Sequence, residues 1–303
     1  PYIMLSLIMI MTAVIHPGTM SMEWIANKSD SALSLILVAI GQTFVLITGG
    51  FDLSVGGIIC VTNSLLAAYM GDTTGSILLF VFIAMLIGAG VGMLNGFIVE
   101  KAKIQPFIVT FASQLVLYGV ALLILDIDGG IVAPGFIKVL LFRIWNIPFS
   151  MIAIAVLVII WLYVKRTKIG MAMYAIGSNE KAAHLNGISV LKTKIIAYGA
   201  SGFFAALAGI FRTAQVASGS PTAGINFVMP SIAAAVIGGT SISGGEGGIL
   251  GSIIGVFIIR GITDLLVFMR VSSYWTSLVQ GMLLLSAVAI TSYVKLHKKG
   301  DLE

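Results

Sequence analysis

The stretch "TGGFDLSVGG", residues 48–57, lies between two apolar segments that are long enough to be buried in lipid. Its four glycines form helices poorly, and Asp52 places a carboxylate at the same point. Backbone that leaves a helix inside a membrane has unpaired N–H and C=O groups, which are tolerated only when they are buried in protein or face water. We therefore expect an interrupted helix here, of the kind that transport proteins use beside a pathway.

Three roles are open for Asp52. It or Ser54 can cap the helix that begins near Val55, because a side-chain oxygen can accept a hydrogen bond from a free backbone N–H. Alternatively, Asp52 contacts a solute directly, or it contacts a partner on the cytoplasmic side. Capping is the simplest of the three interpretations.

A second glycine-rich stretch, "IGGTSISGGEGG" at 237–248, also separates two apolar segments. An alignment without gaps pairs Gly49 with Gly238 and Asp52 with Ser241, another capping residue. One short match is weak evidence for a repeat, so we interpret it as local similarity. The candidate pathway residues at these two interruptions are Gly49, Gly50, Asp52, Ser54 and Gly56, and Gly238, Gly239, Ser241, Ser243 and Gly245.

The composition indicates an all-α membrane protein that crosses the bilayer many times. Of its 303 residues, 58% are hydrophobic and 10% are charged, whereas about 25% are charged in a soluble domain. The mean hydropathy is +1.09. We expect one transmembrane domain, 1–303, and we expect the native N-terminus to lie upstream, because the chain begins with Pro1 instead of Met.

Apolar stretches predict about ten transmembrane helices, several of them short for a bilayer core of about 30 Å. The least certain boundaries are those of the pieces at 32–70 and 231–263. The uncharged stretches are 2–15, 32–48, 57–70, 76–99, 107–125, 149–164, 195–211, 231–240, 249–259 and 274–294. Within them, the spacing of Gly88, Gly92 and Gly96 allows a second helix to approach closely.

Basic residues predict the orientation. The loop 165–194 holds six Lys or Arg residues and one acid, and the link 101–103 and the tail 295–299 are also basic. Counting spans puts all three on one side, the cytoplasm, so the C-terminus is expected there and nucleic acid is not an expected partner. The longer outside segments, 16–31 and 126–148, suit interfacial helices that either contact an outside partner or cap the bundle.

The sequence lacks the residues that several classes of function require. No ionisable residue lies deep in an uninterrupted apolar stretch, which disfavours a proton-driven carrier. The three histidines lie in loops or tails, so Ser54 and Ser243 have no buried base, and we assign neither a catalytic residue nor a metal site. No glycine is followed by lysine, so the chain has no phosphate-binding P-loop, and any energy must come from another subunit.

The large cytoplasmic loop contains "AIGSNEKAAHLNGIS", in which we expect a helix of about two turns. Ser178 or Asn179 can cap its N-terminus and Gly187 can end it. Its apolar surface for a partner would come from Ala182, Ala183 and Leu185. An ordinary connector that lies on the protein's own surface is the alternative. The candidate partner-binding residues are Gly177, Ser178, Asn179, Glu180, Lys181, Ala182, Ala183, His184, Leu185 and Gly187.

Four motifs together resemble the permease subunit of ribose-type ABC importers. They occur in the family's order, and the similarity covers the chain from about residue 32. The motifs are "GQTFVLITGGFDLSVGG", "NGFIVEKAKIQPFIVTFAS", "TKIGMAMYAIGSNEKAAHLNGI" and "AAVIGGTSISGGEGGILGSIIG". That family includes permeases for ribose, xylose, arabinose, galactosides and autoinducer-2, with nucleoside permeases as a neighbouring branch.

The resemblance implies a permease of the bacterial cytoplasmic membrane that pairs with a second copy or a paralogue. Two cytoplasmic ATPase domains would bind ATP and Mg, so this chain would need no cofactor, and a substrate-binding protein would dock outside. Asn179–Leu185 would be the coupling helix that inserts into the ATPase, and the two glycine-rich stretches would lie near the pathway or its gate.

The resemblance implies a sugar as the solute, with autoinducer-2 or a nucleoside as the alternative. The acidic stretch "LDIDGGIVAPGF", 125–136, departs from the sugar permeases and leaves the solute open. A facilitator that works without ATP is a hypothesis of another class. The candidates for a weak polar lining, each of which could instead form a plain interhelical hydrogen bond, are Gln42, Thr43, Asn63, Asn95 and Gln114.

Overall fold

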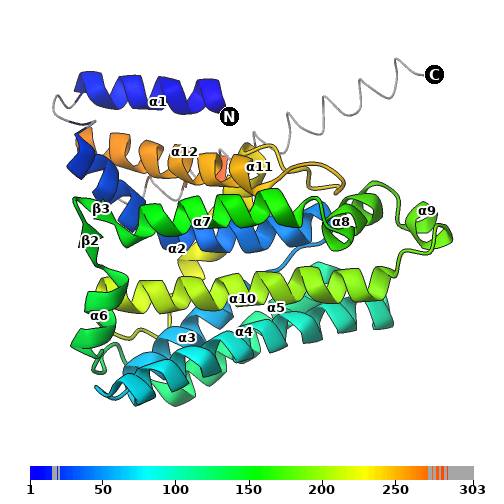
Figure 1. The fold of residues 1–303 in the computed structure, drawn as a ribbon, viewed down its shortest axis with the longest axis horizontal. Coiled ribbons are helices and arrows are strands. Elements are labelled where there is room, and N and C mark those ends of the chain that lie inside the picture. Colours follow the sequence, from blue (N-terminus) through cyan, green and yellow to red (C-terminus); the bar gives the residue numbers. More distant parts are fainter. Residues whose placement is uncertain are drawn as a thin grey trace.

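The computed structural model describes residues 1–15, 19, 21–271, 275, 278–279, 281–282 and 285. Within this part the fold is a bundle of helices with one two-stranded hairpin (Figure 1). The elements are α1 (Tyr2–Ile15), α2 (Met22–Ile47), α3 (Val55–Tyr69), α4 (Thr74–Ala102), α5 (Pro106–Ile124), α6 (Pro134–Leu140), β2 (Arg143–Ile144), β3 (Ile147–Pro148), α7 (Phe149–Val164), α8 (Lys168–Ser178), α9 (Glu180–Leu185), α10 (Val190–Val216), the 3₁₀ helix η1 (Ile225–Phe227), α11 (Val228–Ile237) and α12 (Ile249–Phe268).

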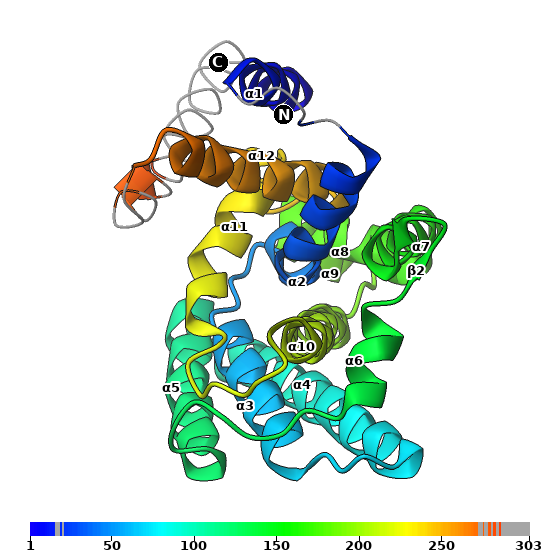
Figure 2. The same ribbon diagram turned by 90° about the vertical axis from the view of Figure 1, so that its left-hand side faces the viewer.

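The centre of the bundle is formed by α2 and α10, which pack against each other. Figure 2 looks along the bundle and shows α3, α4 and α5 on one side of α10, with α11, α12 and α1 beyond α2. The most apolar part of α2 is 89% buried inside the chain, so this helix is the core of the fold. Helix α9 lies at one end of the bundle, and α6 lies with the β2–β3 hairpin at the other (Figure 1).

Five helices of the described part are long and apolar enough to cross a membrane, namely α2, α4, α5, α10 and α12. The number is six if α7 and α8, which meet at a bend of 76°, form one span. Three further apolar helices are shorter. Most of the predicted segment 274–294 lies outside the described residues, and the count of about ten spans therefore stays a prediction.

Ion pairs place the charged loops at two opposite ends of the bundle. Lys103 lies 3.5 Å from Glu180, so the link 101–103 and the loop 165–194 share one end, as the charge distribution predicts. At the other end, Arg143 pairs with Asp30 at 3.0 Å. The basic tail lies outside the described residues.

The prediction that 16–31 is a separate interfacial segment is wrong for the second half of this range. Residues 22–31 are the first turns of α2, because Ser21 caps this helix by accepting a hydrogen bond from the N–H of Trp24 at 3.1 Å. A carboxylate in the first turn, that of Glu23, also favours a helix start. The second predicted segment, 126–148, contains α6 and the hairpin.

Two arginines correct the expectation that no ionisable residue lies deep in an uninterrupted span. Arg212 lies within α10 and Arg260 within α12, because both helices continue past the end of their apolar run. Arginine inside a membrane helix is rare and needs a partner or access to the interface.

Glycines bring α4 and α10 into close contact, as their spacing predicts. A β-carbon at Gly88 would collide with the carbonyl group of Gly202, and one at Gly92 would collide with that of Tyr198. Small residues permit such close packing without a driving force from water. This contact fixes α4 against the helix that follows the basic loop 165–194.

Candidate functional site

Helix α9 is the predicted short helix of the cytoplasmic loop. Asn179 is its N-cap and accepts a hydrogen bond from the N–H of Ala182 at 3.0 Å. The chain leaves the helix through Gly187, whose φ of 80° is a left-handed conformation that glycine adopts without strain. Ser178, the other candidate cap, is the last residue of α8.

The apolar residues of α9 do not all face outward. Leu185 is 86% exposed, but Ala183 is only 4% exposed and packs with Ile176 of α8 and Val190 of α10. The expectation that Ala183 offers surface to a partner is therefore wrong. Ala182 and Leu185 lie on the exposed surface of α9, together with the polar residues Lys181 and His184.

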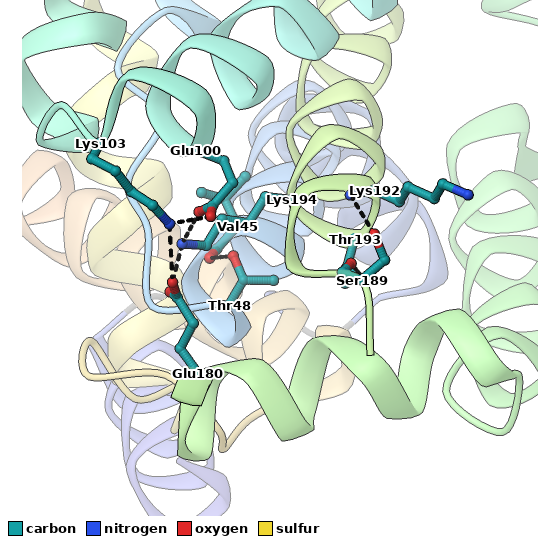
Figure 3. Close-up of polar contacts among 9 residues, drawn as sticks. All are labelled: Val45, Thr48, Glu100, Lys103, Glu180, Ser189, Lys192, Thr193 and Lys194. Atoms are coloured by element: carbon teal, nitrogen blue, oxygen red, sulfur yellow. Dashed lines mark hydrogen bonds and ion pairs between the residues drawn. The ribbon is translucent and has the colours of Figure 1, made fainter. Parts of the chain in front are cut away.

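Four charged residues tie α9 to the neighbouring ends of α4 and α10 (Figure 3). Lys194 of α10 donates to Glu100 at 2.8 Å and to Glu180 at 2.7 Å, and Lys103 pairs with both carboxylates. Burial alone would raise the pKa of Glu180, but the hydrogen bond and charge of Lys194 and the charge of Lys103 outweigh it and lower this pKa. The hydrogen bond with Glu100 raises the pKa of Lys103. Both groups are therefore held in their charged forms.

The first glycine-rich stretch begins where α2 ends. The N–H of Gly50 donates to the carbonyl of Val45 at 3.1 Å, and that of Gly49 donates to the carbonyl of Leu46 at 2.8 Å. With Gly49 at a φ of 78°, this is a Schellman ending, which satisfies carbonyls that the helix leaves free.

The second stretch begins with the same ending, one residue later than the alignment predicts. Here the N–H of Thr240 donates to Ala235 at 2.9 Å, and Gly239 has the positive φ of 98°. The structural counterpart of Gly49 is thus Gly239, and the alignment with Gly238 is wrong. The gapless match also fails further on, because residues 48–54 separate α2 from α3, whereas the longer segment 238–248 separates α11 from α12.

These two segments and the end of α8 meet in what we call the glycine junction, formed by residues 47–49, 177 and 244–247. The N–H of Gly245 donates to the carbonyl of Ile47 at 2.9 Å. Gly177 packs against both groups, and a β-carbon there would collide with the carbonyl of Ile47 and the N–H of Gly245. The hydroxyl of Tyr174 donates to the carbonyl of Gly247 at 2.7 Å. The helix that precedes α9 is therefore in direct contact with both interruptions.

Asp52 lies at the centre of a buried polar network. Its side chain is fully buried, and its Oδ1 accepts hydrogen bonds from the N–H of Ser54 at 3.0 Å and from its hydroxyl at 2.5 Å. The side-chain amide of Asn95, on α4, donates to the Ser54 hydroxyl at 3.0 Å, and the hydroxyl of Ser113, on α5, donates to the side-chain oxygen of Asn95 at 2.5 Å. The predicted cap is wrong in detail, because neither Asp52 nor Ser54 accepts an N–H group from within α3.

Two side chains from the core hold the same segment. The hydroxyl of Tyr198, on α10, donates to the carbonyl of Phe51 at 3.2 Å. The amide of Gln42, on α2, donates to the carbonyl of Asp52. The non-helical backbone between α2 and α3 thus finds its partners in protein, as backbone inside a membrane must.

The other polar lining candidates divide into two groups. Thr43 and Asn63 are buried and form interhelical hydrogen bonds, to Ser252 at 2.6 Å and to Thr213 at 2.8 Å. Asn95 is buried and hydrogen-bonded as well, but it also borders an apolar groove of about 430 Å³ between α4 and α5. Gln114 lies half-buried beside the α3 glycine Gly56. In the loop 238–248, Ser241 is buried and Ser243 is exposed.

Sequence reasoning missed the residues that join these parts. Glu100 and Lys194 lie 94 positions apart in the chain, and no local pattern connects them. Tyr174 and Tyr198 were given no role by the sequence. Gly177 was counted with the partner-binding segment, although a glycine inside a helix is itself a signal of close packing.

Comparisons with known proteins identify the family. The family model described as "Branched-chain amino acid transport system / permease component" matches residues 25–288. The ribose import permease protein RbsC of Haemophilus influenzae is 33% identical over 98% of this chain and 94% of its own length. RbsC of Bacillus subtilis is 36% identical over 96% of this chain and 91% of its own length.

The galactose/methyl galactoside import permease protein MglC of Escherichia coli is 29% identical over 98% of this chain and 95% of its own length. No solved structure matches the chain. The resemblance that the four motifs carry is confirmed by these matches, which extend over nearly all of the chain. The chain therefore belongs to the family of membrane permeases that is described as the permease component of branched-chain amino acid transport systems.

Proposed function

We propose that the chain is the permease subunit of an ATP-binding cassette importer that carries a monosaccharide across the bacterial cytoplasmic membrane. The observation that carries this proposal is the similarity to ribose and galactose import permeases over nearly the full length of both chains. A pentose or a hexose is the solute class that both kinds of relative share. The relatives' names imply an import system, whose energy this chain would take from a partner.

Helix α9 is the proposed docking point for a separate ATPase, which binds the ATP and Mg that this chain does not need. Leu185 projects from it into solvent, and no other part of α9 offers a large apolar side chain. Exposed apolar side chains that can fill a pocket are typical anchors of protein interfaces. The basic loops would then face the cytoplasm, together with the C-terminus.

Motion of α9 has two structural routes into the bundle. Glu180 carries it through Lys194 and Lys103 to α10 and to the end of α4. A displacement of α9 would also move Gly177, and through the glycine junction it would reach the ends of α2 and α11. A docked ATPase that binds one position of α9 better than another would shift the bundle between inward-open and outward-open states.

The proposed solute contacts are weak and polar. Asn95 and Ser113 are linked by a hydrogen bond of 2.5 Å beside the α4–α5 groove, and their network continues to Asp52 at the interruption. Amide and hydroxyl groups can exchange hydrogen bonds with the hydroxyl groups of a sugar. A second permease, identical or paralogous, would complete the pathway, and an external binding protein would select the solute.

Reconstituted transport tests the proposal. Proteoliposomes that contain this chain are prepared with and without the ATPase and the binding protein. Uptake of radiolabelled ribose, galactose and leucine into them is then measured. The proposal predicts uptake of ribose or galactose only with ATPase and ATP. Uptake of leucine alone would instead indicate a branched-chain amino acid permease, as the family model is described. Uptake of any solute without ATPase would identify a facilitator. If all three solutes fail, autoinducer-2 and nucleosides are the next substrates in the panel.

A further inference from the structure

A seam beneath the N-terminal helix combines apolar walls with an excess of positive charge. Helices α1, α2 and α12 enclose a pocket of about 240 Å³ at the end of the bundle opposite α9. Most of its lining is aliphatic or aromatic, including Ile8 and Met9 of α1 and Phe257 of α12. Its charged lining residues are Lys28, Arg260 and Asp264.

The charges in this seam do not balance. Lys28 of α2 pairs with Asp264 at 2.6 Å and lies 5.6 Å from the centre of the Trp24 ring. This pair satisfies the one carboxylate of the seam. None of the ion pairs among the described residues includes Arg260, and its Nε atom is buried without a hydrogen-bond partner there. Arg212 on α10 adds a like charge near Arg260, and Asp264 attracts Arg260 without forming an ion pair with it.

A guanidinium group inside an apolar seam needs an anion. Its planar donors match the oxygens of a phosphate group, and the phosphate is the anion that a bilayer supplies. Trp24 and Lys28 are side chains of the kind that lie at the level of lipid headgroups. The other face of α1 is apolar and exposed, with Ile3 88% and Val14 75% exposed, and such a face suits contact with lipid acyl chains.

We propose that this seam binds one anionic phospholipid, whose phosphate contacts Arg260 and whose acyl chains lie along α1 and α12. Positive charge selects a headgroup with net negative charge, such as that of phosphatidylglycerol, over a zwitterionic one. The apolar walls of the seam pack against acyl chains. A phosphate compound that has no acyl chains therefore does not fill the site. Bound lipid would fasten α1 to the bundle.

Native mass spectrometry of the purified chain tests this site. Phosphatidylglycerol, phosphatidylcholine and glycerol 3-phosphate are titrated separately onto the wild type, R260M, R260K and R166M. The matched control R166M removes the same charge at the opposite end of the bundle. The expected result is preferential binding of phosphatidylglycerol, weakened about fivefold in R260M but not in R260K or R166M. Equal binding by R260M and wild type, equal binding of phosphatidylcholine, or equal binding of glycerol 3-phosphate would overturn the proposal.

Two further measurements keep the outcome clear if R260M folds poorly. Phosphatidylglycerol should raise the melting temperature of the wild type and of R260K, and raise that of R260M less. A chain with M9C and C60A, treated with a bifunctional maleimide, tests the other possible occupant. If a second copy occupies the seam, cross-linked dimers form and added phosphatidylglycerol does not reduce them, which would also overturn the proposal.

Discussion

The backbone N–H of Gly245 donates to the carbonyl of Ile47 at 2.9 Å, which joins the loop before α12 to the last residue of α2. Gly177 packs against both groups of this hydrogen bond from the end of α8. The two interruptions of the bundle and the base of α9 are therefore one packed unit. A movement of α9 cannot leave the ends of α2 and α11 undisturbed.

A methyl group at Gly177 should break this unit. The new β-carbon would overlap the carbonyl of Ile47, and overpacking of this kind costs about 1–3 kcal/mol in unfolding free energy. We expect G177A to lower the melting temperature and to abolish ATP-driven uptake. The control is G119A in α5, where a β-carbon meets no atom within 4 Å and alanine favours the helix. Equal melting temperatures of G177A and G119A would contradict the packing described here.

Ala182 and Ala183 form a matched pair for separating docking from folding. Ala183 is 4% exposed, so A183R forces a charge into the contact between α8, α9 and α10 and should lower the melting temperature. A182R places the same charge on the exposed side. We expect it to keep the melting temperature and to lose binding of the ATPase, as measured by co-purification. Normal co-purification of A182R would argue against docking at α9.

Lys194 should be the most important member of the charged cluster. Its side chain is 14% exposed and bridges two carboxylates, so K194M leaves the largely buried Glu100 with the exposed Lys103 as its remaining partner. We expect a loss of about 1–3 kcal/mol in unfolding free energy, measured by denaturation in detergent. The matched control is K192M on the same helix, because the side chain of Lys192 points away from the cluster (Figure 3). A similar loss in both variants would show that the cluster contributes nothing specific.

The contribution of Glu180 should depend on pH in one direction. Lys194 and Lys103 lower its pKa below the ordinary value of 4.5, although burial opposes them. The folded state therefore gains stability from this carboxylate above pH 4.5 and loses it as the pH falls through the lowered pKa. Its side chain is 43% exposed, so the difference in melting temperature between wild type and E180Q should be small. That difference should vanish in acid, and a difference that grows in acid would contradict the sign.

The sequence predicted the parts of this fold that depend on local chemistry. Apolar runs located most of the helices, and the capping residues Asn179 and Gly187 bounded α9 correctly. The break after α2 was predicted because Gly49 and Gly50 cannot continue a helix without cost. Such features depend on neighbours within a few residues, which one sequence contains.

Features that depend on packing were missed or wrong. The burial of Ala183 follows from the angle at which α9 meets α8, and nothing in the local sequence sets that angle. The contact of Gly245 with Ile47 joins segments that are distant in the chain. Residues 22–31 were expected to form a separate interfacial helix, because their polar side chains end the apolar run, but they are the first turns of α2. The extra turns that place Arg212 inside α10 were misjudged for a similar reason, because charge at the end of an apolar run was taken as its limit.

Protection of one side chain tests the central claim, that a separate ATPase holds this permease by α9. In a C60A background, L185C and L123C place thiols at two sites with 86% and 88% exposure on opposite ends of the molecule. A soluble maleimide should label both in the free chain. With the ATPase bound, the account predicts that L185C is protected and that L123C is still labelled. Full labelling of L185C in the complex would contradict it.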